Sequence, residues 1–252
     1  MAIPNVYHDP RRADSYASIG IEGTYYLAFR DLPEILAAHV SGRRALDFGC
    51  GAGRSTRFLK QLGFDALGAD VSESMLAIAR RRDPGGVYHH IADGDLRALE
   101  PGGFDLVLCA FPFDNIAGDD RRAGIMRGLA RLLAPGGCVV LVASTPELYL
   151  HEWLSFTTAA FPANREARSG DTVYIVIDDI GGDARPIPDL LWRHEDYVAL
   201  LEGAGLSVRA VERPLGRDGD PYEWVSERTV APWAIYVAVR EGRSPEDAER
   251  PS

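Results

Sequence analysis

The sequence predicts an α/β fold with a doubly wound, seven-stranded and mostly parallel sheet. From Arg43 to about Ser144, short apolar runs alternate with segments whose apolar residues recur at helical spacing. The runs are almost continuously apolar, which is typical of parallel strands that helices cover on both faces. The seven strands are expected at residues 44–48, 66–70, 87–91, 105–110, 138–143, 206–211 and 233–240.

The helices between these strands are predicted from apolar spacing and from capping residues. Residues 54–62 carry three apolar side chains at helical spacing. Ser72 is a suitable N-cap for a helix through Arg82, because its hydroxyl can accept a hydrogen bond from a free backbone N–H group. Further helices are expected at about residues 120–133, ended by Pro135-Gly136-Gly137, at about 194–203, and once or twice within 14–40.

The change of rhythm along the chain predicts its organisation. Residues 1–42 are expected to form an N-terminal helical lid before the first strand, and residues 43–240 one α/β domain. After the fifth strand, about residues 145–190 carry aromatic clusters and Gly/Pro turns, and only 172–178 have the pattern of a strand. We therefore expect a cap inserted there. The polar residues 241–252 are expected to form a flexible tail.

Charge and composition restrict the partners. The formal net charge of −10 would repel a phosphate backbone, so a long nucleic acid is not expected as a partner. The basic runs Arg80-Arg81-Arg82 and Arg121-Arg122 are interpreted as solvated helix faces. No apolar run has membrane-spanning length, and the first residues lack the pattern of a secretory signal. A small-molecule substrate and no membrane partner are expected.

The three cysteines indicate a reduced compartment. Cys50, Cys109 and Cys138 are widely spaced, odd in number and form no Cys-x-x-Cys pair. This usage favours a cytoplasmic protein without disulfides, and it suggests no metal site. The chain is expected to act as a monomer or a homodimer.

A glycine-rich turn is the strongest functional signal. Gly49-Cys50-Gly51-Ala52-Gly53 lies between the first predicted strand and a helix. Glycines allow a tight turn and a close approach of a ligand to the main chain, and the helix that follows offers free N–H groups. In an open α/β sheet such a turn lies at the carboxyl ends of the strands, where ligands bind. The turn predicts a nucleotide site.

The spacing of the turn discriminates between nucleotides. A dinucleotide site favours G-x-G-x-x-G, whereas this turn has G-x-G-x-G followed by Arg54, and it lacks the Gly-Lys-Ser/Thr of a P-loop. Asp47, just before the turn, suits an ammonium group better than a pyrophosphate. Asp70 ends the second strand, 21 positions after Gly49, where a carboxylate can bind ribose hydroxyls. An NAD-linked oxidoreductase remains a disfavoured alternative.

These residues resemble a known family. Leu46 to Ser55 looks like the first motif of the class I S-adenosylmethionine-dependent methyltransferases, which have a Rossmann-like sheet. The resemblance continues in the family's order through four further motifs. These are Gly68-Ala69-Asp70-Val71-Ser72, Gly94-Asp95-Leu96-Arg97, Phe104-Asp105-Leu106-Val107 and Leu132-Leu133-Ala134-Pro135-Gly136-Gly137.

The resemblance implies S-adenosylmethionine as cofactor, S-adenosylhomocysteine as product and no metal. It places the methionine moiety at the glycine turn, the ribose at Asp70 and the sulfonium beside Phe111. It also places the adenine at Asp95, with Asp93 as the alternative, because Asp93-Gly94-Asp95 allows two alignments. The residues expected to bind the cofactor are Tyr25, Arg30, Asp47, Gly49, Gly51, Asp70, Val71, Gly94, Asp95, Leu96, Ala110 and Phe111.

The acceptor side is less constrained by the sequence. Methyl transfer from a sulfonium is an in-line displacement that mainly needs alignment and exclusion of water, and a base is required only when a proton must leave early. His151 is the candidate base, since histidine titrates near neutrality. Candidate substrate contacts are Phe113, Asp114, Tyr222 and Trp233.

The expected activity is methyl transfer to O, N or C of a small molecule. Two alternatives stay open within the same cofactor class. One is a protein or small-RNA methyltransferase. The acidic net charge argues against an RNA acceptor but not against a protein acceptor. The other is a non-catalytic protein that binds S-adenosylmethionine.

Overall fold

The computed structural model describes residues 16–178 and 185–240. The expected flexible tail, the first fifteen residues of the expected lid and residues 179–184 of the cap lie outside these ranges. No helix among the described residues is long and apolar enough to cross a membrane.

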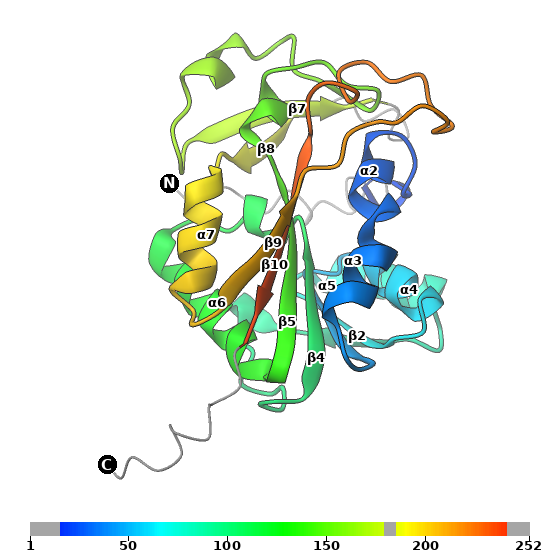
Figure 1. Ribbon diagram of the computed structural model, residues 1–252, viewed down its shortest axis with the longest axis vertical. Coiled ribbons are helices and arrows are strands. Elements are labelled where there is room, and N and C mark those ends of the chain that lie inside the picture. Colours follow the sequence, from blue (N-terminus) through cyan, green and yellow to red (C-terminus); the bar gives the residue numbers. More distant parts are fainter. Residues whose placement is uncertain (1–15, 179–184, 241–252) are drawn as a thin grey trace.

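Seven strands form the main sheet, and their order confirms the predicted doubly wound α/β fold (Figure 1). They are β1 (Arg44–Phe48), β2 (Asp65–Asp70), β3 (Val87–His90), β4 (Phe104–Ala110), β5 (Leu133–Ser144), β9 (Ser207–Glu212) and β10 (Trp233–Val239). The spatial order is β3-β2-β1-β4-β5-β10-β9. β10 runs antiparallel to β5 and β9, while the other neighbouring pairs are parallel.

The helices begin and end close to the predicted positions. Ser72 caps α5 (Glu73–Arg82) as expected, since its hydroxyl accepts a hydrogen bond from the Met75 amide at 3.4 Å. Among the residues that the structure describes, α2 (Thr24–Arg30) and α3 (Leu32–His39) precede β1 and lie against the same side of the sheet as α4 (Arg54–Gln61) (Figure 1). The helices are α2 (Thr24–Arg30), α3 (Leu32–His39), α4 (Arg54–Gln61), α5 (Glu73–Arg82), α6 (Asp119–Leu132) and α7 (His194–Glu202).

Side-chain alternation on the strands buries both faces of the sheet. On β5, Val140 and Val142 belong to a core cluster shared with α2, α3 and α4. Val139 and Leu141 belong to a second cluster shared with α6 and α7. Because successive side chains of a strand point to opposite faces, a continuous apolar run buries both sides at once.

The fifth strand begins earlier than predicted. Pro135-Gly136-Gly137 was expected to end the preceding helix as a turn, but α6 ends at Leu132 and β5 starts at Leu133. The pairing with β4 is irregular between Phe104 and Leu106, which accommodates the turn-forming residues within the strand. Gly136 has a φ of +77°, a backbone conformation that favours glycine.

The cap contains a three-stranded antiparallel sheet, of which one strand was predicted. Its strands are β6 (Phe156–Thr157), β7 (Thr172–Ile177) and β8 (Ile187–Leu190), in the order β6-β7-β8. The cap lies over the carboxyl end of β5 (Figure 1). Two of its strands escaped prediction because β6 has only two residues and β8 carries Pro188.

Candidate active site

The glycine turn after β1 closes over β2 and leaves no room for a side chain at Gly49. The amides of Gly49 and Cys50 both donate to the Ala69 carbonyl, at 2.7 and 3.1 Å. Gly49 has a φ of +72°, and a Cβ there would lie 2.5 Å from the Cβ of Pro112. Glycine is therefore required at this position both by backbone conformation and by contact with the segment after β4.

Asp70 orders the turn from the end of β2. Its Oδ2 accepts a hydrogen bond from the Gly51 amide at 2.8 Å, and its Oδ1 accepts one from the Ser72 amide at 2.7 Å. Burial raises the pKa of this carboxyl, and the backbone donors oppose that shift. A carboxylate has about four lone-pair sites, so Asp70 retains the capacity to accept from a ligand.

A cavity of about 250 Å³ opens at the carboxyl ends of the first four strands; it is called the larger cavity, to distinguish it from a smaller one beneath the cap. Seven of the residues predicted to bind a cofactor line it, namely Gly49, Gly51, Asp70, Val71, Gly94, Ala110 and Phe111. It is also lined by Tyr16, Phe48, Ser72, Met75, Ile91, Pro112, Asn115, Ile116, Arg121 and Ile125.

Asp47 lies buried beneath the turn. Its Oδ2 accepts hydrogen bonds from the hydroxyls of Ser55 and Thr56, at 2.8 and 2.5 Å, while Oδ1 has no hydrogen-bond partner. Burial raises the pKa of this carboxyl to about 6, although both hydroxyls oppose the shift. A buried carboxylate oxygen without a donor is costly, so it suits a site where a ligand supplies one.

The third predicted motif lies differently from the expectation. Gly94 lines the larger cavity, but Asp95 points to solvent, where it forms an ion pair with Arg97 at 2.7 Å. The Arg97 hydrogen bonds lower the pKa of Asp95 to about 2. Leu96 packs in the core, and Asp93 is exposed and does not line the cavity. The chain turns here through positive φ at Asp93 and Gly94, and neither carboxylate lines the cavity.

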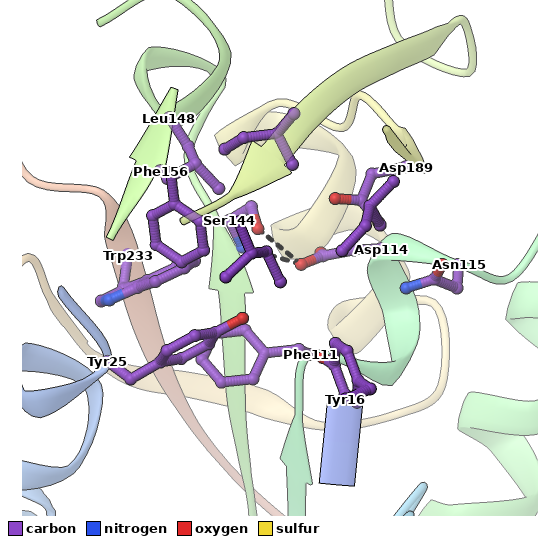
Figure 2. Close-up of a pocket in the computed structure, with 13 residues that line it drawn as sticks. Tyr16, Tyr25, Phe111, Asp114, Asn115, Ser144, Leu148, Phe156, Asp189 and Trp233 are labelled. Atoms are coloured by element: carbon purple, nitrogen blue, oxygen red, sulfur yellow. Dashed lines mark hydrogen bonds between the residues drawn. The ribbon is translucent and has the colours of Figure 1, made fainter. Parts of the chain in front are cut away.

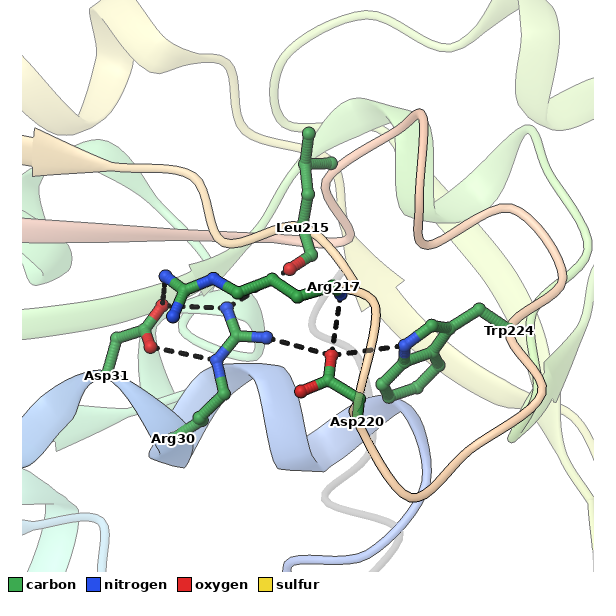
Figure 3. Close-up of polar contacts among 6 residues, drawn as sticks. All are labelled: Arg30, Asp31, Leu215, Arg217, Asp220 and Trp224. Atoms are coloured by element: carbon green, nitrogen blue, oxygen red, sulfur yellow. Dashed lines mark hydrogen bonds and ion pairs between the residues drawn. The ribbon is translucent and has the colours of Figure 1, made fainter.

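Arg30 and Tyr25, the predicted residues of the N-terminal helices, also lie outside the larger cavity. Arg30 forms ion pairs with Asp31 at 2.8 Å and Asp220 at 3.0 Å, and donates to the Leu215 carbonyl (Figure 3). The contacts of the Arg30 guanidinium with Asp220 and Leu215 attach the loop before β10 to α2. Tyr25 lines a second, smaller cavity.

This smaller cavity, of about 30 Å³, lies between the sheet and the cap (Figure 2). It shares Tyr16, Phe111 and Asn115 with the larger cavity, so the two adjoin. Apolar and aromatic side chains dominate its lining. The lining residues are Tyr16, Tyr25, Phe111, Asp114, Asn115, Ser144, Leu148, Phe156, Ile175, Ile177, Ile187, Asp189 and Trp233.

Two carboxyl groups face the smaller cavity. Asp114 accepts hydrogen bonds from the amide and hydroxyl of Ser144, at 3.1 and 2.7 Å, and from the Tyr197 hydroxyl at 2.7 Å. Asp189 accepts one from the Tyr149 hydroxyl at 3.2 Å. Burial, with the nearby charge of Asp114, raises the pKa of Asp189 to about 8. A carboxyl of this kind can bind or release a proton near neutral pH.

The predicted acceptor-side residues divide between cavity and core. Trp233 and Asp114 line the smaller cavity, whereas Phe113 is fully buried against Phe48. Tyr222 packs on Tyr26 and Trp224.

His151, the candidate base, lies in neither cavity. The short 3-10 helix η4 (Pro146–Tyr149) turns the chain so that Leu148 and Tyr149 point inward, and His151 follows beside Trp153.

Several site residues were missed by sequence reasoning. Asp189 lies in the cap, where no motif marks it. Arg121 lines the larger cavity, although its run was interpreted as a solvated face. That interpretation is wrong for Arg122, which is buried with its guanidinium 3.5 Å from the Trp192 ring centroid. The helical position of Arg122, three residues before Ile125 and seven before Leu129, could have indicated the buried face.

Comparisons with known proteins agree with this geometry. A family profile described as "Methyltransferase domain" matches residues 45–137, which contain the glycine turn and Asp70. A curated relative, the N-demethylindolmycin N-methyltransferase of Streptomyces griseus, is 28% identical over 200 residues, which are 78% of this chain and 83% of that protein. The chain belongs to the class I S-adenosylmethionine-dependent methyltransferases. The methyltransferase is thus an enzyme of a family that uses S-adenosylmethionine.

A second curated relative matches over a shorter region. The ubiquinone biosynthesis O-methyltransferase of Methylococcus capsulatus is 37% identical over 112 residues, 42% of this methyltransferase. The match spans about half, 46%, of that relative's length.

Solved structures share the fold. An S-adenosylmethionine-dependent methyltransferase from Mesorhizobium loti matches 83% of this methyltransferase and 97% of that chain, with a TM-score of 0.59 and 21% identity. Streptomyces venezuelae DesVI matches 86% of this chain and 92% of that one, with a TM-score of 0.57 and 21% identity.

Proposed function

We propose that this methyltransferase transfers the methyl group of S-adenosylmethionine to a small molecule whose reacting atom enters the smaller cavity. The observation that carries this proposal is the contact between the two cavities. Tyr16, Phe111 and Asn115 line both, so a ligand in one reaches a ligand in the other. The cap and the N-terminal helices, expected at residues 145–190 and 1–42, provide walls of the acceptor side.

The residues of the larger cavity fit the cofactor. Gly49 and Gly51 let the methionine moiety approach the main chain, and Asp70 has free lone pairs for ribose hydroxyls. Asp47 does not line this cavity, but it lies beneath the turn with an Oδ1 that has no donor, and this oxygen suits the ammonium group. Val71, Gly94, Ala110 and Phe111 complete the proposed contacts. Once bound, the cofactor supplies a methyl group activated by the positive charge on sulfur.

The protein's own contribution is alignment and exclusion of water. Phe111 has a φ of +72° directly after β4, a strained conformation for a non-glycine residue, and it forms the wall common to both cavities. Its ring contacts those of Trp233 and Tyr25, with centroids 4.8 and 5.7 Å apart. These buried rings keep solvent from the reacting atoms and hold the acceptor in line with the methyl–sulfur bond.

A small acceptor is favoured over a macromolecule. Most of the side chains that line the smaller cavity are buried, and its volume of about 30 Å³ admits only the reacting end of an acceptor. The Streptomyces griseus relative is named for a small-molecule substrate, which supports the same class here. An RNA acceptor is disfavoured by the net charge of −10.

A substitution that fills only the smaller cavity tests this proposal. Ile175 lines that cavity from β7, while Tyr174 on the opposite face of the same strand is exposed. With radiolabelled S-adenosylmethionine and a panel of small acceptors, we expect acceptor-dependent formation of S-adenosylhomocysteine. Ile175→Phe should lower it about tenfold or more, since a misplaced acceptor loses alignment. The Tyr174→Phe control should keep full turnover.

S-Adenosylhomocysteine affinity should be equal in both variants, because neither residue lines the larger cavity. No turnover with any small acceptor, or methylation of proteins alone, would contradict the proposal.

A further inference from the structure

Asp189 places a carboxyl group on the apolar face of the cap sheet. β7 and β8 pair antiparallel with Val173 opposite Asp189 and Ile175 opposite Ile187. These four side chains share one face of the sheet, and all are buried. A carboxyl group among branched aliphatic side chains is costly to bury, so its presence at the cavity calls for a polar partner in a ligand.

The two carboxyl groups of the smaller cavity differ in how they are satisfied. Asp114 accepts three hydrogen bonds from protein donors, and the guanidinium of Arg122 acts on its charge. Among the residues that the structure describes, Asp189 receives hydrogen bonds from the Tyr149 hydroxyl and the side chain of Asn115 alone. No lysine or arginine lines this cavity among the residues that the structure describes. Asp189 is therefore the carboxyl with capacity left for a cation.

Aromatic rings enclose the other end of the cavity. Figure 2 shows Tyr25, Phe156 and Trp233 gathered opposite Asp189 and Asp114. The ring centroid of Tyr25 lies 5.2 Å from that of Phe156 and 5.5 Å from that of Trp233. Aromatic faces attract cations through their quadrupole and also pack against apolar groups. The chemistry of both ends suits a cationic group with an apolar substituent.

We propose that the acceptor is an amine with an apolar substituent, and that Asp189 binds its ammonium group and accepts the proton that must leave before methyl transfer. This assignment rests on the proposed function and names its substrate class. An anionic acceptor, such as a phenolate or a carboxylate, would face two carboxyl groups with no lining cation among the described residues. Arg54 lies nearby, 4.6 Å from the centroid of the Tyr25 ring, but it does not line this cavity.

The reaction balances with the groups named. The Asp189 carboxylate takes one proton from the bound ammonium, which leaves a neutral amine with a free lone pair. The nitrogen lone pair forms the new N–C bond while the methyl–sulfur bond breaks, and the electrons of that bond leave with sulfur. The products are a methylated ammonium ion, a neutral thioether and a protonated Asp189. The proton on Asp189 returns to solvent when the products leave.

The pH dependence of binding follows from the state of the empty site. Since burial raises the pKa of Asp189 to about 8, the carboxyl is mostly protonated at neutral pH before a ligand binds. An ammonium ion stabilises the carboxylate, so binding near pH 7 should release a proton. The titratable groups that act on Asp189 are Asp114 and Tyr149. Tyr25 lies across the cavity and is affected by the charge of Asp189, Tyr16 is hydrogen-bonded to Tyr25, and Arg122 acts on Asp114.

Calorimetry in the presence of saturating S-adenosylhomocysteine tests the proposal. The probes are arylalkylamines such as 2-phenylethylamine, each paired with its alcohol and its carboxylic acid. We expect the amines to bind about tenfold or more tighter than their pairs, as charge-assisted hydrogen bonds do. Titration in buffers of different ionisation enthalpy near pH 7 should detect proton release with the amines only.

Asp189→Asn should remove both the preference for amines and the proton release. The control is Asp178→Asn, which changes an exposed carboxyl at the end of β7 and should behave as wild type. Equal S-adenosylhomocysteine affinity in both variants reports that they fold.

Three results would overturn the amine assignment. These are equal binding of alcohols or acids, a preference for amines that survives in Asp189→Asn, and turnover of oxygen acceptors in preference to amines. The last of these would leave the proposed small-molecule methyltransferase intact. Failure to bind S-adenosylhomocysteine at all would instead overturn the proposed function and this assignment together.

Discussion

At the scale of single residues, the contacts that a side chain would make explain why the turn needs glycine at position 49. Gly49→Ala would place a Cβ 2.5 Å from Pro112, while Gly102, with a similar φ of +70°, has nothing within 4 Å of such a Cβ. Both substitutions should lower the free energy of unfolding by about 1 kcal/mol through backbone strain. Only Gly49→Ala should also weaken S-adenosylhomocysteine binding, because it displaces Pro112 at the larger cavity. Equal binding by both variants would contradict the steric account.

Two buried carboxyls predict how stability depends on pH. The pKa values of Asp47 and Asp189 are raised to about 6 and about 8, so the folded chain holds protons that the unfolded chain has lost. Their contribution is complete below the unfolded pKa of about 4 and is lost as pH rises through these folded values. The free energy of unfolding should therefore fall across that range.

Urea denaturation of the ligand-free protein at about pH 5 and about pH 8.5 measures this fall. Asp189→Asn should show a smaller decrease than wild type, because the variant has no carboxyl to titrate at that position. The same decrease in both proteins would mean that Asp189 has an ordinary pKa in the folded state.

Local sequence patterns predicted the residues of the glycine turn but not those fixed by distant contacts. Gly49 and Asp70 follow from the strand–turn–helix spacing, and both line the larger cavity. Asp95 was predicted to face the adenine, but its ion pair with Arg97 holds it at the surface. Asp189 could not be predicted, because its burial arises from the pairing of β8 with β7 and from packing against residues far away in sequence.

At the scale of elements, Glu227 connects three segments around the acceptor side. Its carboxylate accepts hydrogen bonds from the Thr24 hydroxyl of α2, the Leu154 amide of the cap and the Val225 amide of its own loop, at 2.7 to 2.9 Å. Glu227 is fully buried. Trp233, which follows this loop, donates in turn to the Thr24 carbonyl at 2.9 Å.

Glu227→Ala should lower the free energy of unfolding by roughly 3 kcal/mol or more, because three donors lose a buried acceptor. The control, Glu223→Ala in the same loop, removes an exposed carboxylate and should change stability by less than about 0.5 kcal/mol. Denaturation midpoints with urea measure both. A similar small effect in the two variants would show that the three segments are held by other contacts.

Elements with strong apolar periodicity were predicted well, and those set by pairing were not. The β4 strand and α5 agree closely with the predicted ranges, since each combines a clear pattern with a defined end. The short strands β6 and β8 lack a pattern of their own and form only by pairing with β7. Pro135 to Gly137 has the composition of a turn, yet β5 continues through it, because Leu133 on one side pairs with Phe104 and Cys138 on the other pairs with Leu106.

At the scale of the whole molecule, the sheet sets where the two cavities lie. The strands β1 to β3 extend the sheet in one direction, and β4 and β5 extend it in the other. The larger cavity opens at the carboxyl ends of the strands where this order switches, between β1 and β4. The cap is inserted at the end of β5, so it covers the adjacent position and encloses the smaller cavity (Figure 1). This topology could be predicted from the sequence, whereas the shape of the acceptor site depends on packing within the cap.

Binding of S-adenosylhomocysteine, measured by calorimetry, tests the central claim most directly. Asp70 lines the larger cavity at one end of β2, and the exposed Asp65 begins the same strand. We expect wild type and Asp65→Ala to bind with a dissociation constant well below millimolar. Asp70→Ala should bind about tenfold to a hundredfold more weakly, because a carboxylate hydrogen bond to the ligand is lost. No binding below millimolar concentration, with Asp70→Ala indistinguishable from wild type, would contradict the account.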